Sequence, residues 1–213
     1  RQATRATKIL HAPLLRAKQT GRLAQLPPVV TWQSVVDATV GSTGVADRLY
    51  ANLNGPGHRL VLFDVNRHQE LASVQRPQAG ALIERLRQGQ RSYELAVVSN
   101  RDPARLAIGV RHLAPDGTST SRDTGLAWPA SIVSLGHVAL PFPAHDPVYG
   151  FSAGSGHGGI PSIGSWLLRG ESGAVTITLG ALTRLRSNPF WALIDSDVAA
   201  LVAADMERAT TAR

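Results

Sequence analysis

Short apolar runs alternate with helical patterns along most of this chain. β-branched and aliphatic residues follow one another in four strand-like runs, at 29–34, 59–65, 93–99 and 106–113. Stretches with helical spacing of apolar residues separate the first three of these runs. Strands that alternate with helices are typical of βαβ units, which build parallel sheets. The pattern therefore predicts one α/β unit with a mainly parallel sheet and flanking helices.

The second half of the chain has a less regular pattern. Polar residues predict a loop over 115–124, and a short buried strand is expected around Ile132. Gly and Ser dominate 150–164, which predicts an irregular segment, and 174–179 is a last strand candidate. From Asn188 onward the apolar spacing predicts a long C-terminal helix.

The N-terminal residues carry a different pattern from the rest. Apolar residues recur at helical spacing over 2–18 with basic residues between them, and Pro13 divides this stretch into two short helical pieces. No repeat or linker divides the chain further. We therefore expect residues 1–213 to form a single α/β unit, with helices before residue 27 and the core after it.

Composition narrows the class of protein. The chain has 213 residues, of which 43% are hydrophobic and 17% charged, as in a globular domain with a core of its own. Cysteine is absent, which excludes disulfides and thiolate metal sites. No apolar run reaches the roughly 18 residues that a membrane span needs. None of these features assigns a compartment.

The positive charge changes this picture little. The formal net charge is +7 at pH 7, carried almost wholly by arginine, and the arginines are spread along the chain. Aromatic residues make up 5% of the chain and do not alternate with basic ones, as a surface that stacks bases would require. We therefore expect no nucleic-acid partner.

Two titratable residues follow predicted strands. His137 comes directly after the Ile132 strand and before a proline-stiffened loop, and Asp37 follows the strand at 29–34. In open α/β folds, functional groups lie beyond the carboxyl ends of the strands. An aspartate and a histidine in this arrangement could be the acid and base of a nucleophile–base–acid triad, in which the carboxylate fixes the tautomer of the imidazole. The alternative role for Asp37 is that of a turn or helix-capping aspartate.

Several separate blocks of sequence, from about residue 27 onward, resemble those of a known family and follow one another in the same order. They are Gln33–Val40, Leu60–Arg67, Ser134–Pro143, Asp146–Gly150 and Arg186–Phe190. In these blocks the chain resembles the C-terminal half of esterase and lysophospholipase-like members of the α/β-hydrolase family. The resemblance implies an α/β-hydrolase type of sheet, with residues 1–26 as helices of a cap region. It also implies that Asp37 is the catalytic acid and His137 the catalytic histidine.

The function that this resemblance implies is the hydrolysis of a carboxylic ester by a serine hydrolase. The substrate would be lipid-like or acyl in character, the intermediate an acyl-enzyme, and no cofactor would be needed. A membrane surface could present such substrates. In the family the nucleophile precedes the acid, but only 36 residues precede Asp37. The fold is therefore expected to be incomplete without an N-terminal segment or a second chain, which would supply the serine and oxyanion hole.

Ser152 stands in the one sequence that matches a nucleophile elbow literally, Gly150-Phe-Ser-Ala-Gly154. An elbow needs a buried strand before the serine and a helix after it. Here the preceding residues are broken by Pro147, and the following ones are mostly Gly and Ser. A loop beside the site is the better interpretation of this segment, with Ser152 kept as a weaker candidate.

Three alternatives remain open from the sequence. Asp64 follows the second predicted strand and is a reserve candidate for the acid. A metal-dependent hydrolase could use four residues that lie close together in sequence: His137, His145, Asp146 and His157. A non-catalytic binding protein that kept an α/β-hydrolase-like fold would also lack a nucleophile.

Overall fold

The computed structural model describes residues 13, 16–37, 40–75, 80–129, 132–136, 138 and 188–211. Five strands form one sheet: β1 (Val30–Ser34), β2 (Arg59–Phe63), β3 (Glu94–Asn100), β4 (Ala107–Leu113) and β5 (Ser119–Ala127). The helical elements are η1 (Arg22–Gln25), α2 (Ser42–Gly44), η2 (Val45–Leu49), η3 (Tyr50–Asn52), η4 (Gln69–Val74), α3 (Ala81–Gln88) and α4 (Trp191–Thr211).

The sheet is mixed. Its strands lie in sequence order, and β1, β2 and β3 run parallel, whereas β3, β4 and β5 are antiparallel neighbours. The expected α/β arrangement with flanking helices is present, but the prediction of a mainly parallel sheet is wrong, because two of the four strand pairs are antiparallel. A parallel pair needs a long crossover, and only short turns join β3 to β4 and β4 to β5.

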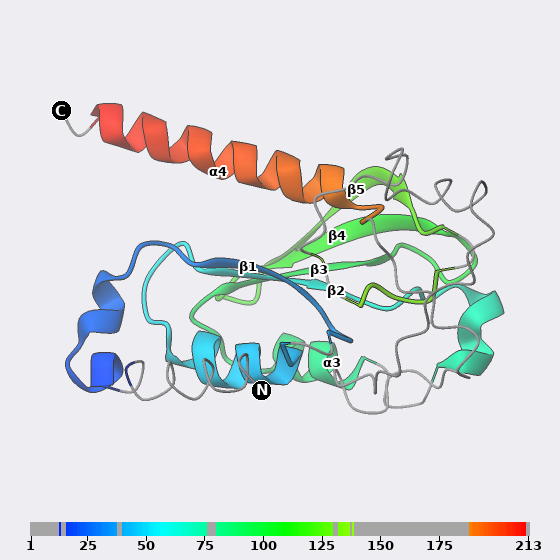
Figure 1. Ribbon diagram of the computed structural model, residues 1–213, viewed down its shortest axis with the longest axis horizontal. Helices are drawn as coiled ribbons and strands as arrows, with labels where there is room; N and C mark the ends of the chain where they lie inside the picture. The colour runs from blue at the N-terminus through cyan, green and yellow to red at the C-terminus, as the bar shows by residue number, and fades with distance from the viewer. Residues whose placement is uncertain are drawn as a thin grey trace, which may run out of the picture.

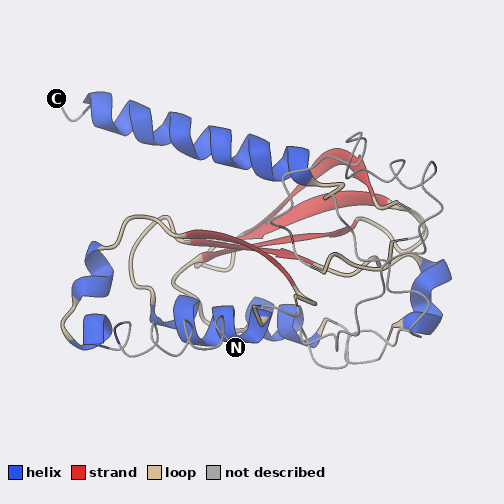
Figure 2. Cartoon of the chain, viewed as in Figure 1, coloured by secondary structure: helices blue, strands red, loops and turns tan. Residues whose placement is uncertain are grey.

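Helices cover both faces of the sheet (Figures 1 and 2). On one face, α2, η2, η3 and α3 lie against the strands, and on the other face lies the start of α4. Because β2 is central to the parallel half, both of its faces are buried: Leu60 and Leu62 belong to the core on the α3 side, and Val61 and Phe63 to the core on the α4 side. This explains why β2 appears as a continuous apolar run in the sequence.

Tyr50 anchors the helical layer on the α3 side. Its ring is fully buried and lies 4.8 Å from the ring of Tyr93. Its hydroxyl lies 2.6 Å from the carbonyl oxygen of Arg59 and 2.9 Å from Oγ1 of Thr31, so it ties β1 to β2. Burial raises the pKa of Tyr50 to about 12, which keeps the hydroxyl protonated as a donor.

The start of α4 packs on the opposite face through aromatic contacts. The Phe190 ring makes an edge contact with Trp128 at 4.8 Å and stacks over Phe63 at 6.1 Å. Farther along α4, the Asp197 carboxylate lies 3.5 Å from Nη2 of Arg59 and 3.4 Å from Nε1 of Trp32. The last turns of α4 extend beyond the sheet (Figure 1). Within the described residues, none of the helices has the length and apolar character of a membrane span.

The local predictions succeeded mainly where apolar residues are dense. β1 to β4 lie within two residues of their predicted ranges, and α4 begins three residues after the predicted start at Asn188. The helical stretches expected between the first three strands are confirmed in outline. The segments 150–164 and 174–179 and the residues before Pro13 lie outside the described residues.

Two local predictions are wrong. The expected loop at 115–124 contains the first part of β5, whose residues up to Asp123 are all exposed, so no apolar alternation marked it as a strand. The expected strand around Ile132 is a segment without regular secondary structure that pairs with no strand of the described sheet.

One prediction follows from the buried imidazole of His58. Its Nδ1 accepts a hydrogen bond of 3.0 Å from the backbone N–H of Val29, and burial lowers the pKa of His58. The pKa of His58 in the folded protein is below its value of about 6.5 in the unfolded chain. The stability that the neutral imidazole contributes is therefore fully present above about pH 6.5 and is lost as the pH falls toward the folded pKa. We expect the free energy of unfolding, measured with urea, to drop between about pH 7 and about pH 5.

The matched variant is His58→Asn, whose side-chain oxygen can still accept from Val29 but does not titrate. Its free energy of unfolding should change less over this pH range than that of the wild type. An equal pH dependence in both proteins would contradict this assignment.

Candidate functional site

Two parallel strands bring two buried carboxylates to the same edge of the sheet. β1 ends at Ser34 and β2 at Phe63, and these two residues are partners in the parallel register. Asp37 follows β1 and is 7% exposed, and Asp64 follows β2 and is 5% exposed. The carboxyl edge of parallel strands is the usual location of functional groups in open α/β sheets.

Asp37 is held in a tight loop. Its Oδ1 accepts a hydrogen bond of 3.0 Å from the backbone N–H of Val40, and its own backbone N–H donates to the carbonyl of Ser34 at 3.2 Å. The side-chain amide of Gln33 closes the loop by donating to the carbonyl of Val40 at 2.8 Å. The contact with Val40 fulfils the turn-forming role considered for this aspartate, and it also fixes the direction of the carboxylate.

Both carboxylate oxygens of Asp64 accept hydrogen bonds. Its Oδ1 lies 2.7 Å from Nη2 of Arg67, and its Oδ2 lies 2.9 Å from Nε of the same guanidinium, a two-point contact. The hydroxyl of Ser99 and the backbone N–H of Val65 also donate to it, at 3.0 and 2.8 Å. These four donors give Asp64 a structural role.

Gly80 makes room for the guanidinium of Arg67. A Cβ atom at this glycine would lie 2.9 Å from Nη2 of Arg67, and its φ of +95° is one that side-chain-bearing residues rarely adopt. The residue therefore allows the arginine to reach Asp64.

Asn66 connects this edge to a segment far away in sequence. Its backbone N–H donates to the carbonyl of Val133 at 2.7 Å, and its Nδ2 donates to the carbonyl of Ile132 at 2.9 Å. Its Oδ1 accepts from Nδ2 of Asn100 at 3.1 Å. Asn66 is fully buried, so all of these bonds form away from water. The irregular segment at 132–136 is thereby held beside the end of β2.

Two further polar residues hold the same segment. The hydroxyl of Ser34 donates to the carbonyl of Leu135 at 2.5 Å, and Nδ2 of Asn188 donates to the carbonyl of Val138 at 3.0 Å. Ser34 and Asn188 are both fully buried. The residues on either side of position 137 are therefore bound to β1 and to the turn before α4.

The other predicted site residues lie outside the described residues: His137, Ser152, and the possible metal ligands His145, Asp146 and His157. The structure therefore describes the surroundings of Asp37 and Asp64 but leaves the histidine, the candidate serine and the metal alternative as predictions. In the described part of the chain, no three histidine or carboxylate groups are gathered as a metal site would require.

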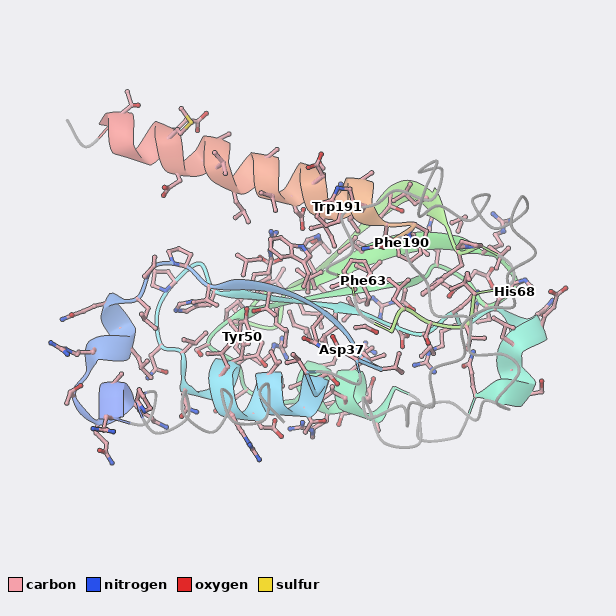
Figure 3. All side chains as sticks on the ribbon, in the orientation of Figure 1. Asp37, Tyr50, Phe63, His68, Phe190 and Trp191 are labelled. Atoms are coloured by element: carbon pink, nitrogen blue, oxygen red, sulfur yellow. The ribbon has the colours of Figure 1, made fainter. Side chains whose placement is uncertain are left out.

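His68 is the described histidine that follows β2 most closely. Figure 3 shows it beside η4 and well apart from Asp37. Its Nδ1 lies 3.7 Å from a carboxylate oxygen of Glu70, in the first turn of η4, which His68 precedes. This histidine therefore does not form a pair with Asp37.

The residues that hold this edge together were not singled out from the sequence. Ser34 interrupts the apolar run Val29–Val36, and Asn66 directly follows the run Leu60–Val65. A buried polar side chain needs hydrogen-bond partners, so a polar residue inside or at the end of such a run is a usable signal. It does not reveal the partners, which are backbone carbonyls more than 60 residues away.

Replacing Asn66 tests whether this residue holds the 132–136 segment. Asn66→Ala removes the side-chain donor to the carbonyl of Ile132 and the acceptor for the side chain of Asn100 and the backbone N–H of His68. We expect the free energy of unfolding to fall by about 2–4 kcal/mol. In hydrogen exchange, backbone amides around 132–136 should lose protection more than those of β3. The control is Asn52→Ala, at a half-buried asparagine whose side-chain hydrogen bonds lie at the surface. Equal losses in both variants would contradict the role of Asn66.

Comparisons with models of protein families, with curated proteins and with solved structures found no match for this chain.

Proposed function

We propose that the chain is part of a serine hydrolase of the α/β-hydrolase type that cleaves carboxylic esters, with Asp37 as the acid and His137 as the base. The observation that carries this proposal is the bond from the Ser34 hydroxyl to the carbonyl of Leu135. It joins a residue three positions before Asp37 to one two positions before His137. Chain connectivity limits how far each site residue can lie from this contact, to about 3.5 Å per residue.

The difference between the two aspartates supports the choice of Asp37. Asp64 already accepts from Arg67, Ser99 and a backbone amide, so an imidazole would have to displace one of these donors. Asp37 is equally buried, and the backbone N–H of Val40 donates to its Oδ1, which fixes the direction of the carboxylate. A buried carboxylate with a fixed direction is what the orienting acid of a triad requires.

In the proposed mechanism the serine hydroxyl adds to the ester carbonyl while Nε2 of His137 takes its proton. Asp37 accepts a hydrogen bond from Nδ1 and stabilises the imidazolium. The alcohol then leaves with the proton from His137, and an acyl-enzyme remains. Water, deprotonated by His137, releases the acid and restores the serine. Backbone amides would bind the oxyanion in both steps.

The serine and the oxyanion hole are proposed to come from a segment that adds to the sheet beside β1. In the described sheet β1 is an edge strand, so its outer backbone groups have no neighbouring strand there. An N-terminal segment or a second chain could pair with this edge and place a strand end next to Asp37. The substrate would be an ester of lipid-like or acyl character, with residues 1–26 contributing to a cap over the acyl group.

The two aspartates can be separated by matched variants. In the assembled enzyme, Asp37→Asn should lower kcat by about four orders of magnitude, because the amide stabilises the wrong imidazole tautomer. Asp64→Asn should leave kcat per folded molecule nearly unchanged but lower the free energy of unfolding by about 2 kcal/mol, because it breaks the pair with Arg67. Ester turnover and urea denaturation measure these effects. A loss of kcat in Asp64→Asn alone would assign the acid to Asp64.

The nucleophile can be located with a fluorophosphonate probe on the tagged chain purified from its native source. We expect labelling of a serine on a preceding segment or a co-purifying chain, and loss of labelling in a His137→Gln variant. Labelling of Ser152 would place the nucleophile in this chain. No labelling of any serine would favour the non-catalytic binding protein, and ester turnover that full chelation abolishes would favour the metal-dependent hydrolase.

A further inference from the structure

The antiparallel half of the sheet forms a cavity that the proposed hydrolase site does not use. The cavity has a volume of about 310 Å³ and lies on the α3 face of β3, β4 and β5. This volume is at the small end of the range for pockets that bind small molecules. Side chains from α3 and from three strands line it, namely Ile83, Arg87, Val97, Arg101, Arg111 and Ser121.

The pleat of β4 places Arg111 in this cavity. Leu113, two residues farther along, belongs to the core on the α3 side, and alternate residues of a strand point to the same face. In the register of the sheet Arg111 lies opposite Val97 on one side and Ser121 on the other. The guanidinium is therefore carried on a strand with an apolar neighbour and a hydroxyl neighbour.

Two of the other three arginines that line the cavity have their charges paired. Arg101 forms an ion pair with Asp123, and Nη1 of Arg87 lies 2.9 Å from a carboxylate oxygen of Glu84. The guanidinium of Arg111 has no hydrogen-bond or ion-pair partner among the described residues. The carboxylate of Asp64 also borders the cavity, but Arg67 neutralises it.

The lack of a side chain at Gly109 leaves space for the aliphatic part of the Arg101 side chain. A Cβ atom at Gly109 would lie 3.1 Å from Cγ of Arg101 and 3.0 Å from the carbonyl oxygen of Arg122. The side chain of Arg101 can therefore cross β4 and reach Asp123 on β5. Arg122 also borders the cavity, but it lies opposite Val110, which belongs to the core on the α4 side, so the pleat directs its side chain to the other face of the sheet. This leaves Arg111 as the guanidinium available to a ligand.

We propose that this cavity binds a small amphipathic carboxylate, with the carboxylate on Arg111 and a short aliphatic chain toward Ile83 and Val97. The planar guanidinium fork matches a carboxylate at two points, and the hydroxyl of Ser121 lies on the neighbouring strand as a further donor. Ile83 and Val97 are both less than 10% exposed and offer an apolar surface to the chain of the ligand. The proposal does not depend on hydrolase activity.

The test is a calorimetric titration of the whole 213-residue chain with hexanoate, hexanol and inorganic phosphate. Hexanoate should bind saturably, whereas hexanol lacks the charge and phosphate lacks the aliphatic chain. Arg111→Gln should weaken hexanoate binding by about tenfold or more, because a charged two-point contact is lost. Arg111→Lys keeps the charge but not the fork, and it should bind with intermediate affinity.

The matched control is Arg22→Gln. Arg22 is an exposed arginine of η1 and does not line the cavity. This variant has the same change in charge and should bind hexanoate within about twofold of the wild type.

Three results would overturn the proposal. They are an equal loss of hexanoate binding in Arg111→Gln and Arg22→Gln, unchanged binding in Arg111→Gln, or saturable binding of phosphate without binding of hexanoate. Shifts of the Ile83 methyl resonances on addition of hexanoate are a second measurement. If hexanoate binds without moving these resonances, it binds elsewhere.

Discussion

The hydrogen bonds of Asn66 are the constraint on which the rest of the candidate site depends. A single buried asparagine bonds to the carbonyl of Ile132, to the side chain of Asn100 at the end of β3, and through its backbone to Val133. Unpaired, these groups would each cost about 1–3 kcal/mol in the interior. The bonds hold the segment at 132–136 in place, and Ile132 and Leu135 of that segment, together with Val138, complete the core beneath α4. Asn188, in the turn before that helix, donates to the carbonyl of Val138.

The two halves of the sheet have different physical roles. Apolar side chains cover the parallel half on both faces, so its candidate functional groups lie at the edge with Asp37 and Asp64. The antiparallel half continues to β5, which is exposed along most of its length and carries polar and charged residues. Such side chains protect an edge strand against pairing with other chains. They also provide the wall of a polar cavity, which the apolar parallel half cannot do.

Asp37 and Asp64 show how neighbouring groups, more than burial, decide what a carboxylate can do. Both are nearly inaccessible to solvent and both follow a parallel strand. Arg67 occupies both oxygens of Asp64, because Gly80 leaves space for the guanidinium. Asp37 instead directs one oxygen toward a backbone amide in its own loop. A buried ion pair is suited to holding structure, and an oriented carboxylate is suited to orienting an imidazole.

The sequence by itself determined the positions of β1 to β4 and of α4, because dense apolar patterns encode which residues must leave water. It also placed Asp37 and Asp64 at strand ends. It did not reveal β5, whose residues up to Asp123 are all exposed, or the antiparallel pairing of half the sheet. Nor did it reveal which carbonyls Ser34 and Asn66 bind, at separations of 101 and 66 residues. Backbone carbonyls are the same at every residue and leave no mark in a sequence, so only the tertiary structure decides these contacts.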